Sequence, residues 1–405
     1  MRTQADQIIR KAIAAVLPDA AVKRALETAV FPGRVILVAA GKAAWQMAKA
    51  AKDALDNRIE KGIVITKYDH VMGPIDGILC REAGHPIPDE NSFAATREAL
   101  ALTENLTETD TVLFLLSGGG SALFEVPLIP GEELQDITAQ LLASGAEITQ
   151  INTIRKRLSA VKGGKFALHC APAKVFSIVL SDIIGDPLDM IASGPAYPDS
   201  STCDQALAIA KTYQLRLSPQ ALACLAQETP KTLNNVTTQI TGSVRELCAA
   251  AAEAAGQLGY EPKILTDTLS CEAKEAGTWL AGLARNASGK TALIAGGETV
   301  VKLTGTGKGG RNQELALSAA AGIDGLEQVC IFSIGSDGTD GPTDAAGGYA
   351  DGNTAVRLRE LGIEISDILH QNDAYHALQK VGGLILTGPT GTNVNDVAVV
   401  LIDKS

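Results

Sequence analysis

The stretch VILVAAGKAAWQMA, residues 35–48, says most about the fold of this chain. The apolar run Val35–Ala39 leads into Gly41 and Lys42, and an amphipathic segment begins at Ala43. A short apolar run bounded by glycine is typical of a strand that is buried on both faces, and a helix directly after it is typical of a βα unit. The stretch therefore predicts a strand, a tight turn and a helix, with Lys42 at the carboxyl end of the strand.

This βα pattern recurs through the first half of the chain. Apolar runs predict strands at 34–39, 62–66, 111–116 and 174–180. Amphipathic stretches predict helices at 5–16, 43–55, 93–105 and 132–143. Alternating strands and helices predict an α/β fold with a doubly wound parallel sheet, whose ligand-binding loops lie at the carboxyl edge of the strands.

A second series of elements begins near residue 237. Strands are predicted at 238–241, 262–266, 291–295, 300–303, 329–334, 383–386 and 397–402, and helices at 243–258, 271–286, 311–320 and 353–361. The segment between the two series, about 200–235, is helical and polar in pattern. We therefore expect two domains, 1–235 and 236–405, of which the second is a smaller α/β domain.

Composition excludes several classes of function. The formal net charge is −11 and aromatic residues are 4% of the 405, so a nucleic-acid partner lacks both a basic footprint and stacking side chains. No apolar run approaches the ~18 residues of a membrane span. The seven cysteines show no C-x-x-C spacing, and the N-terminus lacks a signal-peptide pattern. We expect a cytoplasmic protein with reduced thiols and no membrane or nucleic-acid partner.

Two loops after predicted strands offer anion-binding groups. Lys42 lies at a helix N-terminus, where a cation is comfortable only beside an anion. In TVLFLLSGGGSALFEVP, residues 111–127, the strand ends in Ser117, Gly118, Gly119, Gly120 and Ser121, whose amides can form a nest for phosphate oxygens. The other interpretations, a lysine extended into water and a plain turn, remain open here.

Two further loops carry carboxylates at strand ends. Asp182 and Asp186 follow the strand of VFSIVLSDIIGDPLDMIASGP, residues 175–195, and Asp337 follows the strand of IFSIGSDGTDGPTDAAGG, residues 331–348. Mg²⁺ prefers one or two carboxylates together with phosphate oxygens, so these residues are candidate metal ligands. A helix cap for the first two, and a solvated acidic loop for the third, are the alternatives.

The remaining cations of interest are Arg155 and Arg311. Arg155 begins the run Arg155-Lys156-Arg157, which suits a small anion or simply forms a solvated helix face. Arg311 follows Gly305–Gly310, a G-x-G-x-x-G match that is weak by itself. A guanidinium at that position can bind two phosphate or carboxylate oxygens.

Long strings of this chain resemble the class II glycerate kinases, the family built of a glycerate kinase N-terminal domain and a MOFRL domain. The strings are AAGKAAWQMA (39–48), AGHPIPDENS (83–92), LSGGGSALFEVP (116–127), INTIRKRLSAVKGGKFA (151–167), LSDIIGDPLDMIASGPAYPD (180–199), GGETVVKLTGTGKGGRNQELAL (296–317), GSDGTDGPTDAAGG (335–348) and TGPTGTNVNDVAVVLI (387–402). The chain departs from the family pattern at Arg157, where a histidine is expected, and at Asp69, where glycine is expected.

The resemblance implies ATP-dependent phosphorylation of D-glycerate, usually to 2-phosphoglycerate. It also implies a Rossmann-like larger domain and a smaller α/β domain with the active site in the interdomain cleft. The family's proposed catalytic lysine and arginine match Lys42 and Arg311, and the aspartate of its L-S-D motif matches Asp182.

These expectations combine into one mechanism. ATP phosphates would bind the Ser117–Ser121 amides, with Gly309 and Gly310 contributing, and Mg²⁺ would lie near Asp182 or Asp186. Arg155, or a neighbouring nest of backbone amides, would bind the carboxylate of glycerate. Glycerate and ATP are then the only partners, and the chain would be a monomer or a homodimer.

Two other functions are carried as alternatives. A hydroxypyruvate reductase would use Gly305–Gly310 for NAD(P)H, although the acidic residue at the next strand end, Asp337, lies 27 positions beyond Gly310 rather than about 20. A non-catalytic metabolite-binding protein would use the same cleft without turnover.

Overall fold

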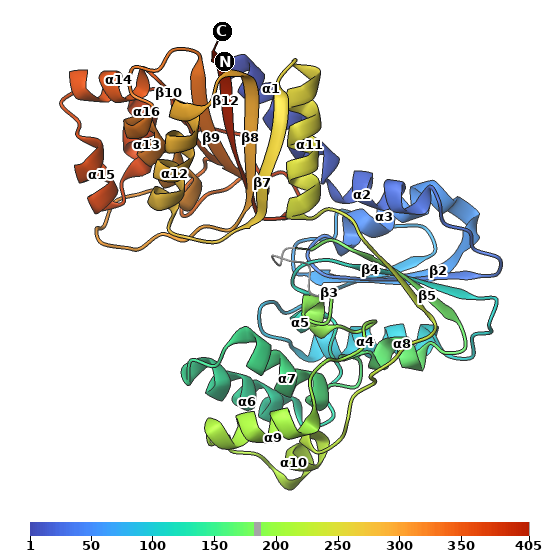
Figure 1. Cartoon of the computed structure of the whole chain (residues 1–405). Coiled ribbons are helices and arrows are strands. Elements are labelled where there is room, and N and C mark those ends of the chain that lie inside the picture. The colour runs from blue at the N-terminus through green and yellow to red at the C-terminus, as the bar shows by residue number, and fades with distance from the viewer. Residues whose placement is uncertain (182–187, 405) are drawn as a thin grey trace. The chain divides into compact units, whose positions relative to one another are not determined.

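The computed structural model describes residues 1–181 and 188–404, which form two compact units. The central unit comprises residues 18–181 and 188–241. The terminal unit comprises residues 1–17 and 242–404, and so contains both ends of the chain (Figure 1). Each unit has a six-stranded sheet of its own.

The sheet of the central unit is parallel throughout. Its strands, in spatial order, are β3 (Ile78–Ala83), β2 (Ile59–Lys67), β1 (Val35–Ala40), β4 (Thr111–Leu116), β5 (Lys174–Val179) and β6 (Val236–Ile240). This is the strand order of the doubly wound Rossmann fold, in which ligands bind where the order reverses. The reversal here lies between β1 and β4, so the loops after these two strands are neighbours.

Helices cover both faces of this sheet. On one face, α2 (Pro18–Leu26) and α3 (Ala44–Leu55) bury alanine and valine side chains against β1 and β4. On the other, Phe114, Phe124 and Phe166 form an aromatic cluster with ring centroids 4.8–5.5 Å apart. The remaining helices are α4 (Glu90–Leu102), α5 (Gly120–Leu123), α6 (Gly131–Ala143), α7 (Ile148–Leu158), α8 (Lys165–His169), α9 (Cys203–Thr212) and α10 (Pro219–Leu225), with 3₁₀ turns at Asp56–Arg58 and Ile191–Ser193.

The sheet of the terminal unit is mixed. Its order is β11 (Leu384–Ile385), β10 (Gly347–Asp351), β9 (Val329–Gly335), β12 (Asp396–Lys404), β8 (Gly289–Gly297) and β7 (Glu261–Leu269). β7 and β8 are parallel, whereas β12 runs antiparallel to both β8 and β9. The start of β12 therefore lies beside the ends of β8 and β9.

Two helical layers enclose this second sheet (Figure 1). One face packs on α1 (Arg2–Ala15) and α11 (Val244–Gln257), and the other on α12 (Ala273–Asn286) and α13 (Arg311–Gly322). The smaller helices are α14 (Thr354–Glu360), α15 (Ile365–Gln371) and α16 (Ala374–Lys380).

The observed units differ from the expected division at 235/236 in two places. Helix α1 packs in the hydrophobic cluster of the terminal unit, through Ile8, Ile9 and Ile13. Strand β6 pairs with β5 and so completes the first sheet.

The expected strand at 300–303 is wrong, because these residues are an irregular loop, and β3 and β10 were not expected.

No helix among the described residues is long and apolar enough to cross a membrane. All seven cysteines are free thiols.

Candidate functional site

The loops after β1 and β4 are joined by hydrogen bonds. The backbone N–H of Lys42 donates to the carbonyl of Gly118 at 2.9 Å, and that of Ala43 donates to Oγ of Ser117 at 3.0 Å. These bonds follow from the pairing of Ala40 with Leu116 at the strand ends. They fix Lys42 beside the serine–glycine loop, as the sequence predicted.

The serine–glycine loop presents unsatisfied amides next to Lys42. Gly119 has φ +87°, and a Cβ built on it would lie 3.0 Å from Cδ2 of His85 and 3.2 Å from Cγ of Lys42. Within the described structure, the N–H groups of Gly118, Gly119 and Ser121 meet no acceptor. Donors of this kind beside a cation suit an anionic ligand.

The side chains of Lys42 and His85 decide the electrostatics of this loop. The half-buried Lys42 ammonium has no carboxylate partner in the part of the chain that the structure describes. Burial, and then the charges of Lys42 and Lys67, lower the pKa of His85, so its imidazole is neutral at pH 7. His85 was assigned no role from sequence, because β3, the strand that ends two residues before it, was missed.

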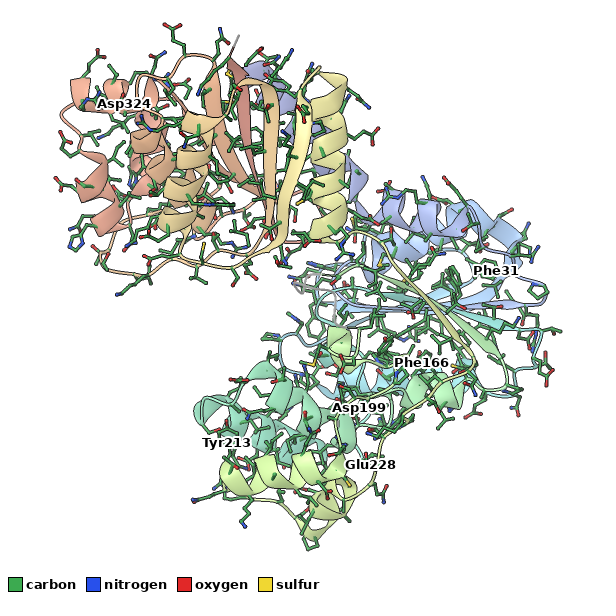
Figure 2. The ribbon with its side chains drawn as sticks, viewed as in Figure 1. Phe31, Phe166, Asp199, Tyr213, Glu228 and Asp324 are labelled. Atoms are coloured by element: carbon green, nitrogen blue, oxygen red, sulfur yellow. The ribbon has the colours of Figure 1, made fainter. Side chains whose placement is uncertain are left out.

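Most cations in the segment 155–165 form contacts within the protein. Asp199 accepts a hydrogen bond from Nζ of Lys156 at 3.0 Å and lies 3.5 Å from Nη1 of Arg157. Glu228 lies 3.3 Å from Nη2 of Arg157 (Figure 2). Both cations are fully buried, so these pairs hold α7 to the segment around Asp199.

Two further lysines nearby are also engaged. Lys162 is fully buried and pairs with the buried Glu125, whose Oε1 is left without a partner. Nζ of Lys165 donates to the carbonyls of Lys156 and Ser159, at the C-terminus of α7. Cations bind helix C-terminal carbonyls favourably, so Lys165 acts as a cap.

Arg155 is the exception in this stretch. Its guanidinium forms no hydrogen bond or ion pair with any described residue. Burial lowers its pKa, and the nearby negative charge of Glu125 opposes that shift. The side chain is only part-buried, so the guanidinium is accessible, and a fork that no described carboxylate holds is available to an anion.

A chain of polar side chains lies in the same unit. Ser121 and Ser193 share a hydrogen bond of 3.2 Å between their hydroxyls, and Ser193 donates to Oδ1 of Asn152 at 2.9 Å. Asn152 and Arg155 are three residues apart on α7 and so lie on the same face of the helix. The chain therefore links the serine–glycine loop to the helix that carries Arg155.

Asp182 and Asp186, the predicted metal ligands of the third loop, lie outside the described residues. Among those described, no three His, Cys, Asp or Glu side chains are grouped to hold a metal ion. The carboxylate of Asp337 is half-buried and accepts the N–H of Thr339 at 2.9 Å. Its predicted role as a ligand stays a prediction.

In the terminal unit, Arg311 is held by two carboxylates. Nε and Nη2 donate to the two oxygens of Asp396, and Nη1 lies 3.0 Å from Oε1 of Glu298. Burial outweighs the attraction of Arg311 and raises the pKa of Asp396 to about 6. Asp396 was missed because its contact requires β12 to be antiparallel, which one sequence does not reveal.

The loop Gly305–Gly310 packs against protein. The N–H of Gly305 donates to Oδ1 of Asn372 at 2.9 Å, and that of Gly307 to the carbonyl of Gln371 at 2.8 Å. A Cβ on Gly310 would lie 2.3 Å from Cγ of Asp340. The glycines are thus needed for these close approaches, while the N–H groups of Gly309 and Gly310 meet no acceptor within the described chain.

This loop is not a dinucleotide-binding loop. The strand before it, β8, and the strand after its helix, β9, are separated by the antiparallel β12. A Rossmann fingerprint needs adjacent parallel strands around the helix. The Asp340 carboxylate also caps α13, accepting the N–H groups of Asn312 and Gln313 at 3.1 and 2.9 Å.

Comparison with known families and proteins agrees with this architecture. Residues 4–226 match DUF4147, a domain of unknown function, and residues 291–396 match the MOFRL family. A Thermotoga maritima protein named D-glycerate 2-kinase is 52% identical, covering 99% of this chain and 98% of its own length. A Pyrococcus horikoshii protein named glycerate 2-kinase is 43% identical, over 91% of this chain and 88% of its own. An Agrobacterium vitis protein provisionally named hydroxypyruvate reductase is 39% identical, over 91% and 87%.

Solved structures are equally similar. The crystal structure of glycerate kinase from Thermotoga maritima superposes with a TM-score of 0.94 at 52% identity, covering 99% of both chains. A Pyrococcus horikoshii protein gives a TM-score of 0.95 at 40% identity, over 100% of this chain and 99% of that one. The chain therefore belongs to the glycerate kinase family that combines a DUF4147 domain with a MOFRL domain.

Proposed function

We propose that this chain transfers the γ-phosphoryl group of ATP to D-glycerate and gives 2-phosphoglycerate and ADP. The observation that carries the proposal is that Lys42 and Arg155 have no ion-pair partner among the residues the structure describes, whereas Lys156, Arg157 and Lys162 are paired. The relatives named glycerate 2-kinase support the choice of substrate.

Lys42 and the serine–glycine loop would bind the transferring group. Phosphoryl transfer passes through a loose transition state, so catalysis depends on positioning and on charge stabilisation. The free N–H groups of Gly118 and Gly119 would donate to phosphate oxygens, while Lys42 neutralises their charge. The neutral imidazole of His85 is available to accept a hydrogen bond or a proton from the attacking hydroxyl.

Arg155 would bind the carboxylate of glycerate. An arginine fork matches two carboxylate oxygens, and burial strengthens the pairing because water competes less. The hydroxyls of Ser121 and Ser193, which are already bonded to each other, offer partners for the two hydroxyls of glycerate. Arg311 would act from the terminal unit on the phosphates of the donor, as the family resemblance implies.

Mg²⁺ would supply charge neutralisation on the ATP phosphates. Because phosphate oxygens and water fill most of its coordination sphere, one or two carboxylates suffice. The half-buried Asp337 carboxylate fits such a ligand, and Asp182 and Asp186 are the other candidates. We expect the enzyme in the cytoplasm, where ATP is supplied and free cysteines stay reduced.

The test is a coupled assay for ADP with Mg²⁺, ATP and D-glycerate, with enolase used to identify the product. We expect ADP to form only when glycerate is present, and we expect enolase to consume the phosphorylated product directly. A product that enolase uses only after a mutase is added would mean phosphorylation at O3. Absence of glycerate-dependent ADP, or oxidation of NADH by hydroxypyruvate, would overturn the proposal.

A further inference from the structure

The terminal unit contains a pocket of about 620 Å³ to which the mechanism above assigns no ligand. It is formed by the loop that joins β8 to α13, by the start of α13 and by residues 340–342. Its volume lies within the range of small-molecule and cofactor sites. Arg311 and Glu298 lie at its lining, so the pocket adjoins the catalytic candidate Arg311.

One part of the pocket lining is aliphatic and exposed to water. Val300 and Leu303 are 60% and 79% exposed. Val300 is held in place by its backbone, since its N–H donates to Cys271 and its carbonyl accepts from Ala273. A fixed apolar surface of this kind is a contact surface for a ligand that has a flat or apolar part.

The loop that carries this apolar surface is firmly built. Oδ1 of Asn372 accepts the N–H groups of Thr304 and Gly305 at 2.7 and 2.9 Å. The side-chain amide of Asn372 also donates to Lys302 and to Glu314. These hydrogen bonds hold the loop in one conformation, which favours tight binding because little ordering cost remains.

The pocket also contains a buried hydrogen-bond acceptor. Glu314 is 2% exposed, and its Oε1 accepts from Asn372 at 2.8 Å. Its Oε2 receives no hydrogen bond from any residue that the structure describes. An amine or hydroxyl of a ligand would satisfy that oxygen.

We infer that this pocket binds the nucleoside end of the phosphoryl donor. A nucleoside presents a flat base to Val300 and Leu303, donates from an amine or a ribose hydroxyl to Glu314, and directs its phosphates toward Arg311. A sugar phosphate has no use for the apolar surface, and a lipid has none for two carboxylates and an arginine. The inference rests on the proposed function in one respect, namely that the donor is a nucleoside triphosphate.

Calorimetric titration of the whole protein tests the inference, with ADP and inorganic tripolyphosphate as probes. Leu303→Asp introduces a charge where the base would lie, at a side chain too exposed to matter for folding. It should weaken ADP binding at least about 10-fold and leave tripolyphosphate binding unchanged. Glu314→Gln, which retains an acceptor for Asn372, should weaken ADP alone. Leu361→Asp, at a 55% exposed leucine of the same unit, is the matched control and should change neither.

Equal ADP affinity in the wild type and Leu303→Asp would overturn the inference, as would failure of the wild type to bind ADP. Equal weakening of both probes would also overturn it, because the pocket would then bind phosphate rather than the nucleoside. The proposed function is judged separately by glycerate-dependent ADP formation. An active wild type with an unaffected Leu303→Asp variant would refute the pocket and leave the kinase activity standing.

Discussion

Replacing Arg155 with methionine should distinguish a role of this residue in glycerate binding from a role in the stability of the fold. Methionine retains an apolar side chain of similar length but removes the charge. Arg155 makes no ion pair in the described structure and its burial disfavours the charged form, so its loss breaks no protein contact of that kind. We expect a free energy of unfolding within about 1 kcal/mol of the wild type, or slightly higher.

The effect on glycerate should be large. A hydrogen bond to a charged group contributes about 1.5–3 kcal/mol, which corresponds to roughly 10–150-fold in kcat/KM for one such bond. The loss should appear in KM for glycerate, whereas KM for ATP should change less than about threefold. Initial rates at varied glycerate and at varied ATP measure both quantities in one assay.

Lys156→Met is the matched control from the next position of the same helix. Lys156 carries the same charge as Arg155 but is fully buried, and its removal leaves Asp199 with one fewer cation. Breaking a buried pair costs about 3–5 kcal/mol, so this variant should unfold at a clearly lower temperature. If Arg155→Met were the unstable variant and kept its KM for glycerate, the assignment of Arg155 to the substrate would be refuted.

Three further outcomes follow from other contacts. Lys42→Met should fold normally and lose on the order of 10²–10³ in kcat, measured by the coupled assay; wild-type turnover would remove Lys42 from the mechanism. Gly119→Ala should raise KM for ATP, because φ of this residue is +87° and the added methyl group would lie 3.0 Å from His85. An unchanged KM for ATP would argue against phosphate binding at Gly119. Activity should fall as pH drops through about 6, where protonation of Asp396 removes an acceptor from Arg311. Asp396→Asn should lose that acidic limb, and an unaltered pH profile would assign the limb to another group.

The same Asp396 makes an opposite contribution to stability. Its folded pKa of about 6 lies above the ordinary value of 3.8, so the folded state binds the proton more tightly than the unfolded state. Its contribution to the free energy of unfolding therefore falls as pH rises from about 4 to 6. Stability and activity should thus move in opposite directions across this window as far as Asp396 is concerned.

Sequence predicted the central unit best where strands are fully buried. β1 and β4 are buried at every residue, and the loops after them carry Lys42 and the serine–glycine loop, as expected. β3 was missed because its sequence, ILCREA, is half polar, and its position at the edge of the sheet explains why. β10, with the sequence GGYAD, has no strand propensity, and pairing with β9 and β11 forms it.

The sequence did not show which cation of the run 155–157 has no partner among the described residues. Arg155, Lys156 and Arg157 are consecutive and chemically alike, and their roles differ because of carboxylates brought from residues 199 and 228. The apolar run 300–303 misled for a related reason. It has three aliphatic residues, as a strand would, but Val300 and Leu303 are exposed at a pocket and only Val301 packs against the core.

The environment of Arg311 shows how an arginine that is already paired with carboxylates can still be available to bind a phosphate. Asp396 is 7% exposed and takes the Nε–Nη2 edge of the guanidinium, so it fixes the orientation of that group. Glu298 is 46% exposed and contacts Nη1 alone, so moving it into water costs little. A phosphate that displaced Glu298 would gain a guanidinium already oriented by Asp396, and the exposed Glu298 carboxylate could move into water and so relieve its repulsion with the phosphate. Arg311 is therefore better described as preorganised than as blocked, since only its weaker partner stands where the donor would bind.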